Sequence, residues 1–64
     1  MMTDQQIKAN VFSIMSKTTL SEAKKSVVEA NDNFEINNKI FDFMMSYLRE
    51  NMSEEDFLDF CDAL

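Results

Sequence analysis

The chain contains neither glycine nor proline among its 64 residues. These residues make up roughly 7% and 5% of average proteins, and they supply most tight hairpin turns and phosphate-cradling loops. Their absence disfavours strands joined by short turns. The composition therefore predicts an all-α protein, with residues 1–64 forming one domain of three to four short helices around a central amphipathic helix.

Histidine is also absent, and the one cysteine is Cys61. Without an imidazole the chain cannot build a serine triad, a cysteine–histidine dyad or a histidine metal site. Cys61 has acidic neighbours and no partner for an internal disulfide, so we expect an inert, buried thiol. The carboxylates near it are interleaved with apolar residues and do not follow the spacing of a calcium loop. We expect no catalytic residues, no metal and no cofactor.

No apolar run approaches the roughly 18 residues of a membrane span, and the first residues do not follow the pattern of a signal peptide. We therefore expect a cytoplasmic protein. A chain this short buries only about 60% of its unfolded surface, so its stability is expected to be marginal unless something supplements the core. Because no disulfide or metal is expected to do so, the sequence leaves a homodimer open.

Three pairs of residues have the spacing of a helix start, in which a hydroxyl side chain precedes Gln, Glu or Asp by three positions. They are Thr3 with Gln6, Thr19 with Glu22 and Ser53 with Asp56. They predict a first helix over about 4–17, a second ending near Asn31, and a last helix after Ser53. We expect Asn31 to adopt the left-handed conformation, since no glycine can end that helix.

The apolar positions predict which face of each helix is buried. The first helix carries Ile7, Val11, Ile14 and Met15 on one side with Phe12 at its edge, and the second carries Leu20, Ala23, Val27 and Ala30. In the last helix Phe57, Leu58, Phe60, Cys61 and Leu64 share an arc of about 160°. Each of these helices is therefore expected to bury one side only.

The segment 37–51 is predicted to be the central helix. Its apolar side chains cover roughly 200° of the helix circumference, too much for a single neighbouring helix. They are Ile40, Phe41, Phe43, Met44, Met45, Tyr47 and Leu48. We expect helices on both flanks, with Met44 in the core and the burial of Met45 and Met52 left open.

The start of this helix is ambiguous. Asp32 and Glu35 have the spacing of a capping box, but a helix beginning there would place the amide of Asn37 within the apolar arc, where an unpaired polar group is costly. We therefore expect Asn37 to be the N-cap. Residues 33–36 would then form an extended connector that places Phe34 and Ile36 in the core.

The formal charge of -6 belongs entirely to the end of the chain. Residues 1–49 hold six acidic and six basic residues, whereas residues 50–64 hold six acidic residues and no basic one. Lys17, Lys24 and Lys25 form the only basic cluster, so strong direct binding to nucleic acid is not expected.

Two acidic residues of the last helix work against helix stability. The helix dipole favours Glu54, Glu55 and Asp56 in the first turn, but it favours cations near the C-terminus, where Asp59 and Asp62 lie. Like-charged neighbours cost a few tenths of a kcal/mol more. One explanation for the presence of Asp59 and Asp62 there is that they keep the protein soluble. The others are an acidic ridge that meets a basic protein, or insertion of the tail into a partner's apolar groove.

The run TLSEAKKSVVEANDNFEINNKI, residues 19–40, resembles the second helix and connector of the Hha/YmoA nucleoid modulators, which bind a DNA-associated silencer protein. Its family motif, Ala-Ala-Asp-His-Arg in the third helix, is replaced here by MMSYLREN. The acidic, aromatic last helix is also similar in character to that of colicin-type immunity proteins, which cover a basic nuclease. Neither similarity assigns the chain to a family.

The sequence predicts a small acidic modulator or inhibitor, of the kind that phages and other mobile elements encode. Its partner would be a basic, nucleic-acid-associated protein. The residues expected to bind it are Glu54, Glu55, Asp56, Phe57, Asp59, Phe60 and Asp62. The alternative is a self-associating structural or regulatory module of the nucleoid-modulator type, in which the acidic residues serve only solubility.

Overall fold

A computed structural model describes the backbone of residues 2–64 and the side chains of residues 2–33 and 38–64. The described chain forms four α-helices and no strand: α1 (Asp4–Ser16), α2 (Leu20–Asp32), α3 (Phe34–Asn51) and α4 (Glu54–Ala63). The predicted all-α bundle is confirmed. None of the helices in this part of the chain has the length and apolar character that crossing a membrane requires.

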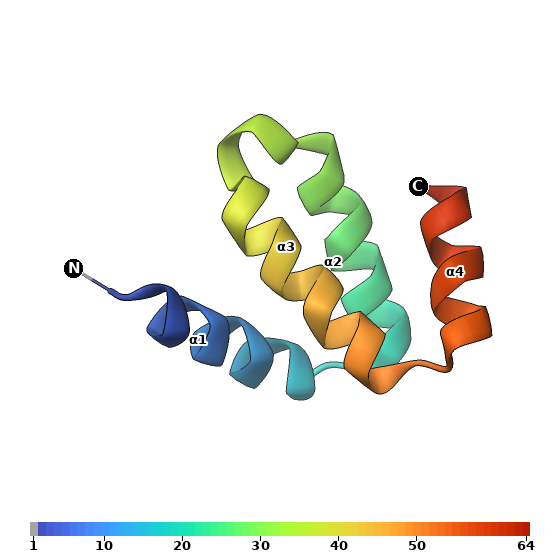
Figure 1. Cartoon of the computed structure of the whole chain (residues 1–64), viewed down its shortest axis with the longest axis horizontal. Coiled ribbons are helices and arrows are strands. Elements are labelled where there is room, and N and C mark those ends of the chain that lie inside the picture. The colour runs from blue at the N-terminus through green and yellow to red at the C-terminus, as the bar shows by residue number, and fades with distance from the viewer. Residues whose placement is uncertain (1) are drawn as a thin grey trace.

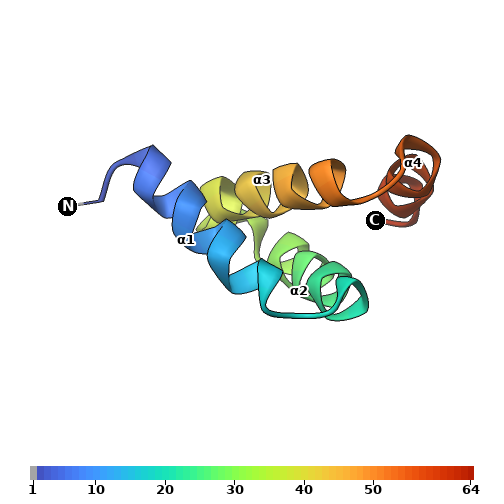
Figure 2. The ribbon, with the colours of Figure 1, turned by 90° about the horizontal axis from the view of Figure 1, so that it is seen from below.

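The longest helix, α3, is the centre of the bundle. Figures 1 and 2 show α1 and α2 lying against it on different sides, and α4 standing beside its C-terminal end. Only Met52 and Ser53 separate α3 from α4, so the chain reverses sharply there. The packing of α4 against α3 is much lighter than that of α1 or α2. The prediction that the third helix has neighbours on both flanks is confirmed.

The core is small and comes from the first three helices. Within the described side chains, those that are buried and apolar are Met15 of α1, Ala23 and Val27 of α2, and Leu48 of α3. Val27 and Leu48 have no exposed surface. Ala23 and Val27 lie on the side of α2 that the sequence predicts to be buried. Partly buried residues surround this cluster, including Met44, Met45 and Met52.

The predicted helix starts are confirmed for α1, α2 and α4. The backbone N–H of Gln6 donates to Thr3 Oγ1 at 3.2 Å, and the N–H of Thr3 donates back to Gln6 Oε1 at 2.8 Å. Thr19 and Glu22 form the same reciprocal pair at the start of α2. Ser53 Oγ accepts from the N–H of Asp56 at 3.2 Å. Each bond satisfies an amide that has no partner within its helix.

The corner between α2 and α3 differs from the prediction. Asn37 is not an N-cap, and residues 33–36 are not an extended connector, because α3 begins at Phe34 and Asn33 alone separates the two helices. The expected burial of Phe34 and Ile36 falls outside the described side chains. α2 also continues past Asn31 to Asp32, and no described residue has a positive φ.

Asn33 explains how the chain turns without glycine. Its backbone has φ −119° and ψ 33°, its N–H donates to the carbonyl of Ala30, and its Nδ2 donates to the carbonyl of Glu29 at 3.1 Å. These bonds satisfy carbonyls at the end of α2. The start of α3 receives no hydrogen bond from a side-chain cap, so the usual sequence signal is missing there.

Most of the predicted buried side of α1 is confirmed, because Met15 is buried and Ile7 and Val11 are partly buried, but Ile14 departs from it. Ile14 is 64% exposed, whereas Phe12, expected at the edge, is partly buried and its ring contacts that of Tyr47. Because Phe12 packs against Tyr47, this side of α1 faces α3, and Ile14 lies at the edge of the contact between the two helices. Leu20 is likewise 43% exposed, because it is the first residue of α2 and lies at the end of the bundle.

Candidate functional site

The last helix, α4, carries all seven residues that the sequence singled out for protein binding. None of the residues of α4 is buried. Its partly buried residues are Phe57, Phe60 and Cys61, and its other residues are exposed. Most of the surface of α4 is therefore open to another molecule.

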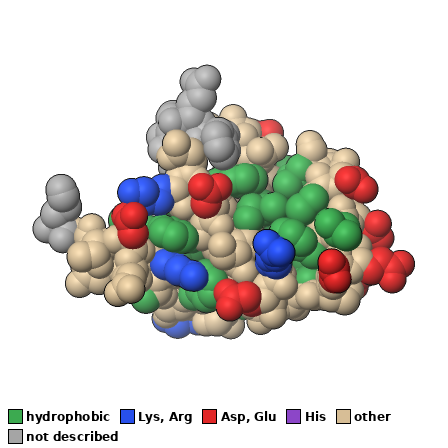
Figure 3. Space-filling view, viewed as in Figure 1, with side chains coloured by type: hydrophobic (Ala, Val, Ile, Leu, Met, Phe, Trp, Pro, Cys, Tyr) green, Lys and Arg blue, Asp and Glu red, His purple; other side chains and the backbone are tan. Residues whose placement is uncertain are grey.

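The carboxylates of α4 are all exposed: Glu54, Glu55, Asp56, Asp59 and Asp62. Glu55, Asp59 and Asp62 follow the i, i+4, i+7 spacing and so share one side of the helix. We call these three residues the acidic ridge. Figure 3 shows acidic side chains along the edge of the molecule formed by α4. Glu54 and Asp56 lie on either side of the ridge.

No cation of the bundle neutralises this charge within the part of the chain that the structure describes. The ion pair found there joins Lys39 Nζ to Asp4 Oδ1 at 2.9 Å, on the far side of the bundle from α4, and both side chains are more than half exposed. The ridge residues thus keep their full interaction with solvent, and a cationic partner would not have to displace an internal ion pair.

The two aromatic residues of α4 are turned towards the bundle. Phe57 and Phe60 are partly buried and pack against the core, together with Met52. They therefore form the wall that joins α4 to the bundle, and their exposed edges are what a partner would touch. Cys61 is also half-buried beside them and free, so its expected full burial is not what the structure shows.

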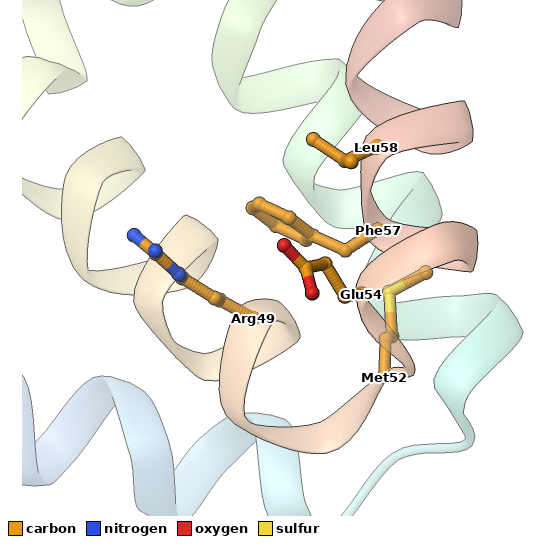
Figure 4. A pocket seen from close by; sticks show the side chains of 5 residues that line it. All are labelled: Arg49, Met52, Glu54, Phe57 and Leu58. Atoms are coloured by element: carbon orange, nitrogen blue, oxygen red, sulfur yellow. The ribbon is translucent and has the colours of Figure 1, made fainter.

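An open pocket of about 570 Å³ lies between α3 and α4. Its lining consists of Arg49 from α3, Met52 from the connection, and Glu54, Phe57 and Leu58 from α4. Figure 4 shows the Arg49 side chain reaching towards the pocket from α3, and the Glu54 carboxylate beside the Phe57 ring on the α4 side. No ion pair joins Arg49 to Glu54 within the described part of the chain.

Leu64 was expected on the buried face of α4 but is 39% exposed at the end of the chain, and Leu58 is another residue of this helix that the sequence placed incorrectly. Leu58 was expected on the buried face of α4, but it is 54% exposed and forms part of the pocket wall. Leu58 lies at one margin of the apolar arc, and α4 is covered by α3 on one side only. Arg49 and Met52 were also absent from the predicted site, because their role depends on where α4 folds back.

The pocket and the neighbouring acidic ridge differ in chemical character. The described residues contain no group of three or more histidine, cysteine, aspartate or glutamate side chains placed to hold a metal ion. What the site offers instead is a row of carboxylates beside a hollow with methionine, leucine and phenylalanine in its walls. This combination suits a surface that is both cationic and apolar.

Comparison with models of protein families, with curated proteins and with solved structures finds no match for the chain.

Proposed function

We propose that this protein is a small acidic modulator that binds a basic, nucleic-acid-associated protein through α4, in the manner of the inhibitors that phages and other mobile elements encode. The observation that carries the proposal is the state of the acidic ridge. Glu55, Asp59 and Asp62 are exposed on one side of α4 and have no cationic partner among the described residues.

The acidic residues near the end of α4 would favour association with a basic protein but do not stabilise the helix. Asp59 and Asp62 lie towards the end of α4, where the helix dipole favours cations, and like charges at helical spacing repel one another. A basic partner reverses both effects, because its cations neutralise the repulsion. Exposed ion pairs contribute only about 0.2–1 kcal/mol each, so the ridge acts mainly by accelerating encounter and selecting partners.

The position of α4 supports the same proposal. Because no residue of α4 is buried, its outer face can vary in charge without disturbing the core of Met15, Ala23, Val27 and Leu48. The cap at Ser53 sets where α4 begins, and Phe57 and Phe60 pack its inner side against the core, so the ridge lies on the outer side. A row of exposed carboxylates at the edge of a small domain is a surface that a larger basic protein can reach.

Affinity capture with a matched pair of variants tests the proposal. The ridge variant D59K/D62K and the control E29K/D32K change the net charge equally, and all four side chains are exposed. From an extract of the organism that encodes the chain, wild type and control should capture the same basic protein, identified by mass spectrometry, and the ridge variant should not. Capture of the same protein by all three chains would contradict the proposal.

The rate of association gives a second test on the captured partner. Screening shortens the range of the ridge to about 8 Å at physiological salt, so the association rate should fall as salt is raised. The ridge variant should associate severalfold more slowly at low salt and show little salt dependence. Equal salt dependence of wild type and ridge variant would show that the ridge does not steer the encounter.

Self-association is the second candidate, and one observation favours it. Val11, Ile14, Met15, Ile40 and Met44 line a hollow of about 150 Å³ between α1 and α3, and all five are apolar. Ile14 and Ile40 are 64% and 42% exposed there. Light scattering tests this function: a dimer that Ile14→Ser converts to a monomer would support it, and a monomeric wild type would contradict it.

A further inference from the structure

We infer that the pocket between α3 and α4 receives an apolar side chain of a basic amphipathic helix, which the proposed partner presents. The inference rests on the proposed function, because it names the element that the acidic α4 would bind. It goes beyond that function by placing the anchor of the complex at Met52, Phe57 and Leu58, beside the ridge and not on it.

The pocket has the form of a receptor for a side chain. Three of its five lining residues, Met52, Phe57 and Leu58, are apolar, and Arg49 and Glu54 form the charged remainder. Its volume of about 570 Å³ leaves room for a bulky side chain and for part of the helix that carries it. Flexible methionine side chains adapt to occupants of different shape. The space-filling view shows hydrophobic side chains gathered between α3 and α4, so the apolar surface extends beyond the pocket itself (Figure 3).

Leu58 joins the pocket to the acidic residues. It lines the pocket and is 54% exposed, although it lies on the same helix as five exposed carboxylates. Its helical neighbours at i−4, i−3 and i+4 are Glu54, Glu55 and Asp62. Residues at these spacings are adjacent on a helix surface. A ligand that covers Leu58 therefore meets carboxylates along its edge.

The charges select the kind of occupant. Arg49 is the one cation in the lining, and its side chain reaches towards the pocket from α3 (Figure 4). Glu54 lies beside the acidic ridge, so carboxylates outnumber cations around the pocket. A nucleic acid or an anionic membrane would be repelled. The occupant that fits is a helix with apolar residues at i, i+3 and i+4 and flanking lysine or arginine. Its apolar side chains would fill the pocket, and its cations would contact the surrounding carboxylates.

A synthetic peptide tests the inference. We would use a peptide of about 18 residues, five helical turns, made of leucine, lysine and one tryptophan on its apolar face. The control is a peptide of the same composition with its order scrambled. Because the protein contains no tryptophan, the peptide's emission reports its own environment. Wild type should bind the amphipathic peptide with a blue shift and bind the scrambled peptide much more weakly.

The decisive variants change one apolar side chain each. Leu58→Ala should weaken binding about five- to tenfold, because it removes an anchor contact. Val28→Ala is the matched control, since Val28 is 43% exposed and lines neither hollow, and it should bind as wild type does. Circular dichroism checks that both variants keep their helices, which exposed alanine substitutions favour.

The outcomes separate this inference from the proposed function. Equal binding by wild type and Leu58→Ala, with loss in D59K/D62K, would overturn the pocket as an anchor and leave the ridge intact. Failure of wild type to bind the amphipathic peptide would also overturn the inference, while capture of a basic protein would still support the function. A wild-type dimer that Leu58→Ala dissociates would show that the occupant is a second copy, which overturns it as well.

Discussion

The rings of Phe12 and Tyr47 meet edge to face, with centroids 5.4 Å apart and planes at 89°. Lys8 Nζ lies 5.3 Å from the centroid of the Phe12 ring, on the solvent side of this pair. Edge-to-face pairs add about 0.5–1.5 kcal/mol to the effect of burial. This contact fixes the rotation of α1 on α3.

Replacing Phe12 tests the contribution of that pair. Phe12→Leu should lower the free energy of unfolding by about 1–2 kcal/mol, since it removes the ring contact and some buried apolar area. Urea unfolding followed by circular dichroism measures the change. Tyr47→Phe keeps the second ring and should differ from wild type by less than about 0.5 kcal/mol. An equal loss in both variants would mean that the tyrosine hydroxyl, and not the ring pair, stabilises the contact.

Truncating the core should have a much larger effect than truncating the pocket wall. Leu48→Ala removes a side chain with no exposed surface and should cost about 2–5 kcal/mol. A domain of this length is stable by only about 3–10 kcal/mol, so the variant should lose a large share of its free energy of unfolding. Leu58→Ala should change thermal stability by less than about 1 kcal/mol, because Leu58 is 54% exposed. A loss of stability in Leu58→Ala as large as that in Leu48→Ala would show that Leu58 belongs to the core.

The start of α2 depends on one hydroxyl. Thr19 Oγ1 accepts from the N–H of Glu22 at 3.2 Å and donates to Glu22 Oε1 at 2.9 Å. Thr19→Ala should reduce stability by about 0.5–2 kcal/mol, since it leaves an amide of the first turn without its cap. Thr19→Ser keeps the hydroxyl and should retain most of the stability in the same thermal denaturation. A full loss with serine would assign the effect to the threonine methyl group.

Two charge reversals within α4 should have opposite effects on stability. Asp62→Lys places a cation near the C-terminal end of the helix and should raise the free energy of unfolding by about 0.3–1 kcal/mol. Asp56→Lys changes the net charge equally but places the cation in the first turn, so it should lower stability by a similar amount. Thermal unfolding at low ionic strength measures both. A stability loss with Asp62→Lys would remove the argument that Asp62 is costly to the fold.

The light packing of α4 should be visible in its dynamics. Because none of its residues is buried, α4 can open without exposing Val27 or Leu48 completely. Its amide hydrogens should therefore exchange faster than those in the second half of α3, in a native-state exchange experiment read by mass spectrometry or NMR. Protection in α4 equal to that in α3 would show that the two helices open together.

Local chemistry allowed the helix starts to be predicted. Thr3, Thr19 and Ser53 act on amides three positions away, so a short stretch of sequence contains the whole interaction. The start of α3 could not be predicted in the same way. Asn33 caps the end of α2 with its own side chain, and the first turn of α3 carries no capping bond that a sequence pattern would reveal.

The exposure of individual side chains on α4 could be predicted only in part. Helical periodicity correctly separates the acidic ridge from Phe57 and Phe60, but it does not say how much of the apolar arc a neighbour will cover. That depends on the reversal at Met52 and Ser53, which places α4 against one end of α3 only. Leu58 is therefore exposed. Arg49 and Glu54 line the same pocket, which could not be predicted from a local sequence pattern because it forms only when α4 folds back on α3.

The absence of positive φ values in the described backbone has a consequence for how this protein can evolve. Where every residue stays in conformations open to all L-amino acids other than proline, no position demands glycine or asparagine for steric reasons. Substitution is then limited chiefly by the few buried side chains and by the hydroxyls that begin three of the helices. A descendant could exchange most of its surface, including the whole of the last helix's outer side, and still trace the same path through space.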